Sequence, residues 1–155
     1  MGRPAIRRAS EAEAEEIARI INAAFEIERE FRRGERTSAQ EIRASIARGE
    51  VLVAEEAGRL LGAIEVRIDG ATGYFGMLAV EANVRRGGIG RALVEAAEDR
   101  CRRAGCTVMT MSTGEERAEL IPYYRKMGYG LTLVEASSSP AFKRPIRVVH
   151  MAKPL

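Results

Sequence analysis

Three glycines and three arginines stand together in mid-chain, directly before a helix-like segment. They belong to the stretch VRRGGIGRALVEAAEDR at positions 84–100. A strand that ends at Val80, a glycine turn at 87–90 and a following helix would aim free backbone N–H groups at one point, where the helix dipole adds positive charge. The arginines can add charge-assisted contacts, and they are Arg85, Arg86 and Arg91. The pattern predicts a diphosphate site, although GGIG alone fits an ordinary glycine-rich loop equally well.

Two common nucleotide-binding motifs are absent from this stretch, and their absence limits which diphosphate ligands fit. A Rossmann fingerprint needs G-x-G-x-x-G early in a βαβ unit, but the third position is Leu93 and the loop follows three strands of an expected antiparallel meander. A P-loop needs a lysine directly after its last glycine, and none follows here. NAD, ATP and GTP are therefore disfavoured, and a dinucleotide-binding protein stays open only as an alternative that rests on the glycines.

The hydrophobic periodicity predicts seven strands and four helices around this loop. Strands are expected at 5–9, 51–56, 59–68, 72–80, 106–112, 129–136 and 145–152, and helices at 11–25, 39–48, 90–104 and 116–127. Ser10 and Ser38 are expected N-caps. The order βααβββαβαββ predicts an α/β (α+β) fold with a mixed sheet and one domain over residues 1–155.

Composition and length exclude several classes of function. The chain has 155 residues and a net charge of +3 with dispersed signs, so neither a basic stripe nor an aromatic platform for nucleic acid is present. No apolar run could span a membrane and no secretory signal is visible, which favours a cytoplasmic protein. Two cysteines and one histidine are too few for a zinc site, so no metal is expected, and Cys101 and Cys106 are best explained as buried, inert thiols.

Two motifs resemble those of the GNAT superfamily of N-acyltransferases. The pattern R-x-x-G-x-G from Arg85 to Gly90 is similar to the acyl-CoA signature of that family, and the strand end Leu78–Val80 precedes it as it does there. The segment IPYYRKMGY looks like the family's late helix, in which a tyrosine lies four residues before a glycine, here Tyr124 and Gly128. The element order also matches, so the resemblance covers nearly the whole chain.

The resemblance implies a largely antiparallel mixed sheet with helices on both faces and two splayed central strands. It implies acetyl-CoA, and hence coenzyme A, as the cofactor. The expected activity is transfer of the acetyl group to a primary amine of a small molecule or peptide by direct attack in a ternary complex. The alternative is a non-catalytic sensor module that binds acyl-CoA on the same fold, and a homodimer remains open.

The same resemblance assigns roles to individual residues. Backbone groups of Leu78 and Val80 would pair with the pantetheine arm, and one N–H would polarise the thioester carbonyl. Tyr124 would be the general acid toward the leaving thiolate. The residues expected to bind the coenzyme are Leu78, Ala79, Val80, Arg85, Arg86, Gly87, Gly88, Ile89, Gly90, Arg91 and Tyr124. One departure is Arg117, which stands where many members carry an asparagine, so the contact made by that asparagine is in doubt here.

A base and an acceptor site are also required. Glu65 and Glu81 are the candidate bases, while solvated strand glutamates are the alternative, and His150 is a further candidate because its pKa is near neutrality. The acceptor is expected near the first two helices, their loop and the last strand pair. The residues predicted to bind it are Glu26, Arg29, Glu30 and Arg33. Their mixed charges fit either a basic acceptor or one that carries a carboxylate.

Overall fold

A seven-stranded mixed sheet in the order β1-β2-β3-β4-β5-β7-β6 forms the frame of the molecule. The computed structural model describes residues 4–84 and 87–155. The strands are β1 (Ala5–Arg8), β2 (Val51–Glu56), β3 (Arg59–Asp69), β4 (Thr72–Val80), β5 (Val108–Gly114), β6 (Gly130–Ser137) and β7 (Ile146–Pro154). The helices are α1 (Ala14–Ala24), α2 (Ala39–Ala47), α3 (Ile89–Arg103) and α4 (Leu120–Arg125), with short 3-10 segments η1 (Glu11–Glu13), η2 (Glu26–Glu30) and η3 (Ala82–Val84).

The predicted order of elements and fold class are confirmed. Ser38 caps α2, because its Oγ accepts a hydrogen bond of 3.1 Å from the Glu41 N–H. The late helix is shorter than predicted and begins only at Leu120. Pro122 explains this difference, since proline is tolerated in the first turn of a helix but would break one that started at residue 116.

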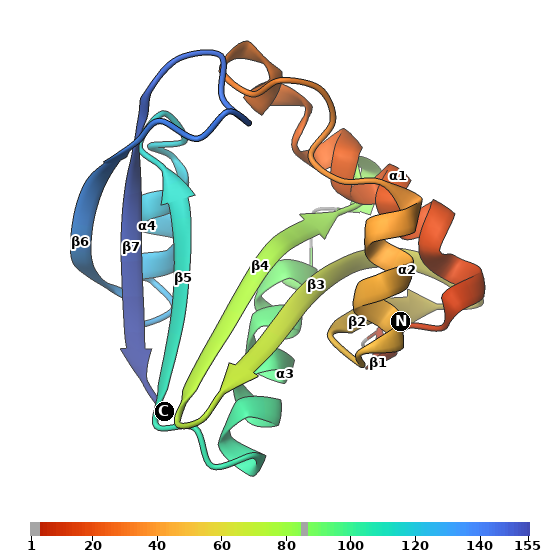
Figure 1. Cartoon of the computed structure of the whole chain (residues 1–155). Coiled ribbons are helices and arrows are strands. Elements are labelled where there is room, and N and C mark those ends of the chain that lie inside the picture. Colours follow the sequence, from red (N-terminus) through yellow and green to blue (C-terminus); the bar gives the residue numbers. More distant parts are fainter. Residues whose placement is uncertain (1–3, 85–86) are drawn as a thin grey trace.

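The two central strands separate soon after they meet. β4 pairs in parallel with β5 only from Thr72 to Tyr74, whereas it pairs with β3 along its whole length up to Val80. Figure 1 shows the result as a V, with β1 to β4 on one arm and β5, β7 and β6 on the other. The splayed central strands implied by the family resemblance are therefore present.

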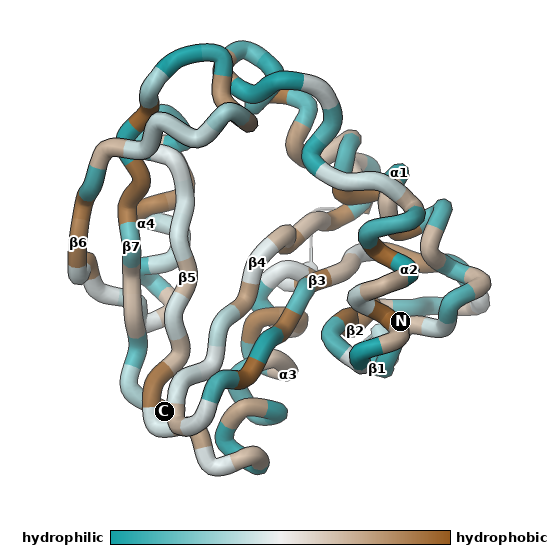
Figure 2. Tube along the Cα trace, viewed as in Figure 1, coloured by the Kyte–Doolittle hydropathy of each residue, from teal (hydrophilic) through white to brown (hydrophobic). Residues whose placement is uncertain are grey.

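Each face of the sheet carries its own apolar core. The larger core lies between the sheet and α3 and α4, and includes Phe75, Leu93 and Met109. The smaller core lies on the face covered by α1 and α2, and includes Ile17, Ile42 and Val53. Figure 2 shows hydrophobic residues along the strands and helices, while the segments that cross the open end of the V are mostly hydrophilic.

A β-bulge in β4 decides which side chains face which core. The register between β3 and β4 shifts after Ala63, and Met77 adopts a positive φ of 50°. Because a bulge adds one residue to the alternation, Phe75 and Leu78 pack against the same core, on the α3 face. Met77 instead contacts the core under α1 and α2. The bulge therefore reverses the faces to which the side chains at the end of β4 point, shortly before the glycine loop.

A buried carboxylate ties the two arms together at the closed end of the V. Glu98 of α3 is almost fully buried, and its Oε2 accepts a hydrogen bond of 2.7 Å from the Tyr129 hydroxyl. Lys153 of β7 donates to both carboxylate oxygens at 3.1 Å. Burial and the Glu98 carboxylate raise the pKa of Tyr129, so its hydroxyl remains a donor. This cluster links α3 to the far arm.

We expect Lys153→Met to lower the free energy of unfolding by about 2–3 kcal/mol, because Glu98 would be left buried without its counter-charge. The change is measured by urea unfolding followed by circular dichroism. The double variant Lys153→Met/Glu98→Gln removes the unpaired charge and should recover much of the loss. Equal stability of wild type and Lys153→Met would contradict a stabilising role for the cluster.

Candidate active site

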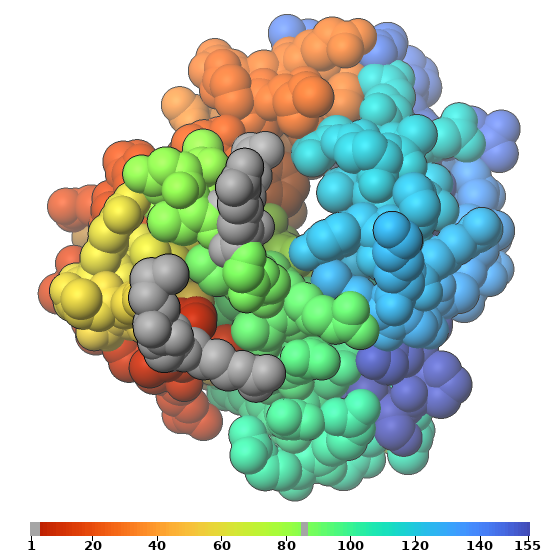
Figure 3. All heavy atoms as spheres, turned by 180° about the vertical axis from the view of Figure 1, so that it is seen from behind, coloured from red at the N-terminus to blue at the C-terminus, as the bar shows by residue number. Residues whose placement is uncertain are grey.

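A cleft of about 650 Å³ occupies the gap between β4 and β5. It is lined on one face of the sheet by the start of α3 and by α4, and on the other face by the end of α1, the segment after it and the β6–β7 loop. Figure 3 shows it from behind as an opening between the β4–α3 region and the α4 region. The cleft therefore gives two ligands access to one point from opposite faces of the sheet.

The glycine loop lies at one mouth of this cleft. Gly88 precedes α3 in the left-handed conformation, with φ of 72°, and nothing lies within 4 Å of where its Cβ would be. Free N–H groups of the first turn of α3 and the helix dipole favour an anion here, and no acidic residue stands in that turn. Arg91, which also lines the cleft, is exposed and adds positive charge. These residues fit the diphosphate of coenzyme A.

The open edge of β4 provides hydrogen-bonding groups along the cleft. The Glu81 N–H donates to the Leu61 carbonyl at 2.8 Å, so Glu81 faces β3. Because backbone groups alternate in direction along a strand, those of Leu78 and Val80 face the gap instead. Past Tyr74 no described strand pairs with this edge. An extended ligand can therefore add to β4 here as an extra strand.

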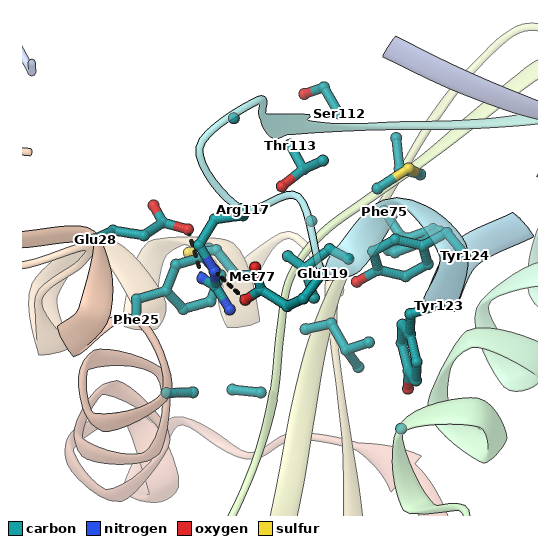
Figure 4. A pocket seen from close by; sticks show the side chains of 18 of the residues that line it. Phe25, Glu28, Phe75, Met77, Ser112, Thr113, Arg117, Glu119, Tyr123 and Tyr124 are labelled. Carbon is teal, nitrogen blue, oxygen red and sulfur yellow. Dashed lines mark hydrogen bonds and ion pairs between the residues drawn. The ribbon is translucent and has the colours of Figure 1, made fainter. Parts of the chain in front are cut away.

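Tyr124 lies deep in the cleft and belongs to the core as well. Its side chain is only 5% exposed and packs with the rings of Phe75 and Tyr129, at centroid distances of 5.7 and 6.3 Å. Figure 4 shows its hydroxyl directed toward the cleft. Burial raises the pKa of Tyr124, so the group holds its proton at neutral pH and can act as a donor.

The neighbouring Tyr123 contacts the start of α3. Its hydroxyl lies 2.6 Å from where a Cβ on Gly90 would be, so Gly90 allows the tyrosine to lie close to the helix. Burial raises the pKa of Tyr123, while the charge of Arg91 opposes that shift. Tyr123 therefore lies at the diphosphate end of the cleft, whereas Tyr124 lies further in. The sequence motif pointed to Tyr124 alone.

The opposite end of the cleft is strongly charged. Glu28 is buried, and its two oxygens accept hydrogen bonds from Arg32 at 3.2 Å and from Arg117 at 2.9 Å. Arg117 also donates to Glu119 at 2.8 Å, as the dashed lines of Figure 4 show. Arg36 lines the same end and lies over the Phe25 ring, with its guanidinium carbon 5.4 Å from the centroid. Arg117, which replaces the family's asparagine, thus lies in the cleft and binds carboxylates.

The predicted acceptor residues surround this end without lining it. Glu26, Arg29, Glu30 and Arg33 belong to or follow η2, and their side chains are largely exposed. The residues of that segment that line the cleft are Glu28, Arg32 and Arg36. The sequence identified the segment but not its inward side, because a short 3-10 helix does not follow the 3.6-residue period used to assign faces.

The candidate bases lie outside the set of residues that line the cleft. Glu81 accepts a hydrogen bond of 2.6 Å from Arg19. Glu65 accepts one of 3.0 Å from the Ser45 hydroxyl, and it lies opposite Gly76, which does line the cleft. His150 contacts Glu135 at 2.8 Å on the far arm. Two of these candidates have a strand partner that lines the cleft: Glu65 pairs with Gly76, and His150 pairs with Ser112.

The remaining predicted coenzyme residues divide into three groups. Ala79 lines the cleft together with Leu78 and Val80. Gly87 and Ile89 flank Gly88 without lining the cleft, and Ile89 is buried in the core beneath α3. Arg85 and Arg86 lie outside the described residues. The structure thus brings the strand end, Gly88, Gly90, Arg91 and Tyr124 to one cleft.

The other expectations concern metals, cysteines and membranes. Within residues 4–84 and 87–155, no three His, Cys, Asp or Glu residues gather as a metal site would require. Cys101 and Cys106 are buried, and burial raises the pKa of Cys101 to about 11, which agrees with inert thiols. Among the described helices, none has the length and apolar character needed to cross a bilayer.

Comparisons with known proteins agree with this geometry. The Azospirillum brasilense protein named "IAA acetyltransferase" is 38% identical over 80 residues, which cover 50% of this chain and 52% of that protein. The chain thus spans about half the length of that relative. A ribosomal-protein-alanine N-acetyltransferase from Brucella melitensis has the same fold, with a TM-score of 0.80, 23% identity and coverage of 97% and 99% of the two chains.

A second solved structure contains the coenzyme. It is yncA from Salmonella typhimurium, described as a putative acetyltransferase with its cofactor acetyl-CoA, with a TM-score of 0.79, 23% identity and coverage of 99% and 95%. The model of the Acetyltransferase (GNAT) family matches residues 14–129, well over half of the chain, which confirms the resemblance found in the sequence. The chain therefore belongs to the Acetyltransferase (GNAT) family.

Proposed function

We propose that this protein transfers the acetyl group of acetyl-CoA to a primary amine by direct attack in a ternary complex. The observation that supports this proposal most strongly is that Gly88 in its left-handed conformation, the unpaired edge of β4 and the Tyr124 hydroxyl all lie in one cleft. A dinucleotide site would need only the first of these features. The acceptor is a small molecule or a peptide that reaches the same point from the α1–α2 face.

The chain's own groups supply three contributions to such a reaction. The backbone N–H groups of Leu78 and Val80 can donate to the thioester carbonyl oxygen, where negative charge develops. The gap holds the two reactants close together, which lowers the entropic part of the barrier. The Tyr124 hydroxyl can give its proton to the leaving thiolate. Since a thiol has a pKa of about 8.5, its thiolate is already a good leaving group, and protonation by Tyr124 adds only modestly to the rate.

Deprotonation of the amine requires a base. Among the described residues, the carboxylates that line the cleft are Glu28 and Glu119. Arg32 and Arg117 occupy the oxygens of Glu28, and the Arg117 hydrogen bond lowers the pKa of Glu119, which weakens it as a base. The bases that we propose are Glu65 and His150, each acting through water, since the strand partners of both line the cleft. If no amine accelerates thiol release from acetyl-CoA, the non-catalytic sensor is favoured instead.

We expect Gly88→Glu to weaken coenzyme A binding by about 100-fold, because a carboxylate would face the diphosphate across the loop. The matched control is Gly58→Glu, which has a similar φ of 79° and equally open space in the β2–β3 turn. Isothermal titration with coenzyme A compares the two variants. Near-wild-type affinity in Gly88→Glu would refute the proposed diphosphate site.

Tyr124→Phe should lower kcat by about tenfold while the affinity for coenzyme A changes little, since the lost group acts on the leaving thiolate. Tyr123→Phe is the comparison, and we expect it to change coenzyme affinity rather than kcat, because its hydroxyl lies at Gly90. Initial rates of thiol release and calorimetry separate the two effects. An unchanged kcat in Tyr124→Phe would leave that residue a core tyrosine only.

The rate should rise with pH as the acceptor amine loses its proton, and it should show no descending limb from Tyr124 below about pH 10. A general acid acts only while protonated, and burial raises the pKa of Tyr124 above the ordinary value. The proton is therefore retained across the accessible range. A descending limb near neutrality that Tyr124→Phe removes would contradict this assignment.

A further inference from the structure

The charged end of the cleft contains more positive than negative groups. We call it the acceptor chamber, and its polar members are Glu28, Arg32, Arg36, Arg117 and Glu119. Three arginines face two carboxylates. Glu28 contacts Arg32 and Arg117, and Glu119 contacts Arg117, so each carboxylate already has an arginine partner.

Arg36 is the member with no carboxylate in direct contact among the described residues. In the part of the chain that the structure describes, no carboxylate lies within 4.0 Å of its guanidinium, and the group packs on the Phe25 ring. Burial lowers the pKa of Arg36 and the charge of Arg32 lowers it further, while the charges of Glu28 and Glu65 offset these effects only in part. A partly buried cation next to a like charge is costly unless an anion approaches it. Arg36 therefore lacks a partner that a ligand can supply.

Arg32 does not remove this excess of positive charge. One of its Nη atoms binds Glu28, and its guanidinium lies 5.0 Å from the Phe142 centroid. Its Nε is buried and has no hydrogen-bond partner among the described residues. Because that Nε is inaccessible, the donors that a ligand can reach on this side of the chamber are those of Arg36. A planar guanidinium is well suited to bind a carboxylate through two hydrogen bonds.

The outer end of the chamber is closed by two segments that meet above it. The Arg33 N–H donates to the Ala141 carbonyl and the Lys143 N–H to the Phe31 carbonyl, both at 2.8 Å. Arg32 and Phe142 form an antiparallel bridge between them. Figure 1 shows these segments meeting over the open end of the V. Such a cover limits the length of acceptor that the chamber can hold.

We propose that Arg36 binds a carboxylate of the acceptor, and that the acceptor is therefore a small amine that carries a carboxylate, as a free amino acid does. This inference rests on the proposed function, since it names the substrate class of the same cleft. A polyamine or a basic peptide would instead bring positive charge toward Arg32 and Arg36. A planar carboxylate matches the guanidinium fork and restores charge balance in the chamber.

Matched ligands test the proposal directly. Glycine, methionine, phenylalanine, aspartate and glutamate are each compared with their α-amides by isothermal titration, with and without coenzyme A bound. The amides keep the amine and lose the carboxylate. We expect at least one amino acid to bind about tenfold or more tightly than its amide. Thiol release from acetyl-CoA should show the same preference in kcat/KM.

Variants of Arg36 test whether this side chain causes the preference for an amino acid over its α-amide. Arg36→Gln should weaken binding of the preferred amino acid by about 10- to 100-fold and leave its amide and coenzyme A unaffected. Arg36→Lys keeps the charge but loses the fork, so it should restore binding only in part. Arg43→Gln is the control, because Arg43 is exposed on α2 and lies outside the cleft. Unchanged coenzyme affinity shows that each variant is folded.

The outcomes that overturn the proposal are distinct from failure of the proposed function. Stronger binding or faster acetylation of the amides, of spermidine or of a peptide N-terminus would overturn it. An equal effect of Arg36→Gln on amino acid and amide would also overturn it. Failure to bind coenzyme A would refute the acetyltransferase instead, and the titrations without coenzyme would still decide whether Arg36 recognises a carboxylate.

Discussion

The site depends on the early separation of β4 from β5. Three residue pairs, from Thr72 to Tyr74, hold these strands together, and the edge of β4 beyond them has no partner strand among the described residues. An unpaired strand edge is normally a liability, since its N–H and C=O groups need partners. Here the edge lines a cleft, so a ligand can supply those partners. Binding of a ligand therefore offsets the free-energy cost of the unpaired backbone groups of β4.

Several local features keep the gap open without loss of the fold. The bulge at Met77 turns the end of β4 so that Leu78 packs on the α3 face while its backbone faces the gap. At the closed end, Gly73 allows β4 to approach Cys101 of α3, since a Cβ there would lie 2.5 Å from its Sγ. The buried Glu98 joins α3 to β7 through Lys153. The arms are thus tied at one end only.

The cleft separates two kinds of recognition on opposite faces of the sheet. The end that we propose for the diphosphate has free backbone groups and a helix dipole, which favour an anion of any kind. The acceptor chamber uses side chains, with Glu28 engaged by Arg32 and Arg117 and with Arg36 left over. The first end fits the family's shared coenzyme, while the second is where this chain can differ in its acceptor. Tyr124 lies between them, within the core that both arms share.

The sequence by itself determined the order of elements, the glycine loop and the family, because periodicity, left-handed turns and short motifs are local properties of the chain. It also placed Leu78, Gly88 and Tyr124 in one site through the resemblance. It did not separate Glu26 and Arg29 from Glu28 and Arg36, since the direction of side chains in a 3-10 segment is fixed by what packs against it. The tertiary structure alone decided that Glu81 pairs with Arg19, that Arg117 binds Glu28 and that Arg36 has no carboxylate beside it among the described residues. These facts depend on contacts between segments far apart in sequence, which no local pattern encodes.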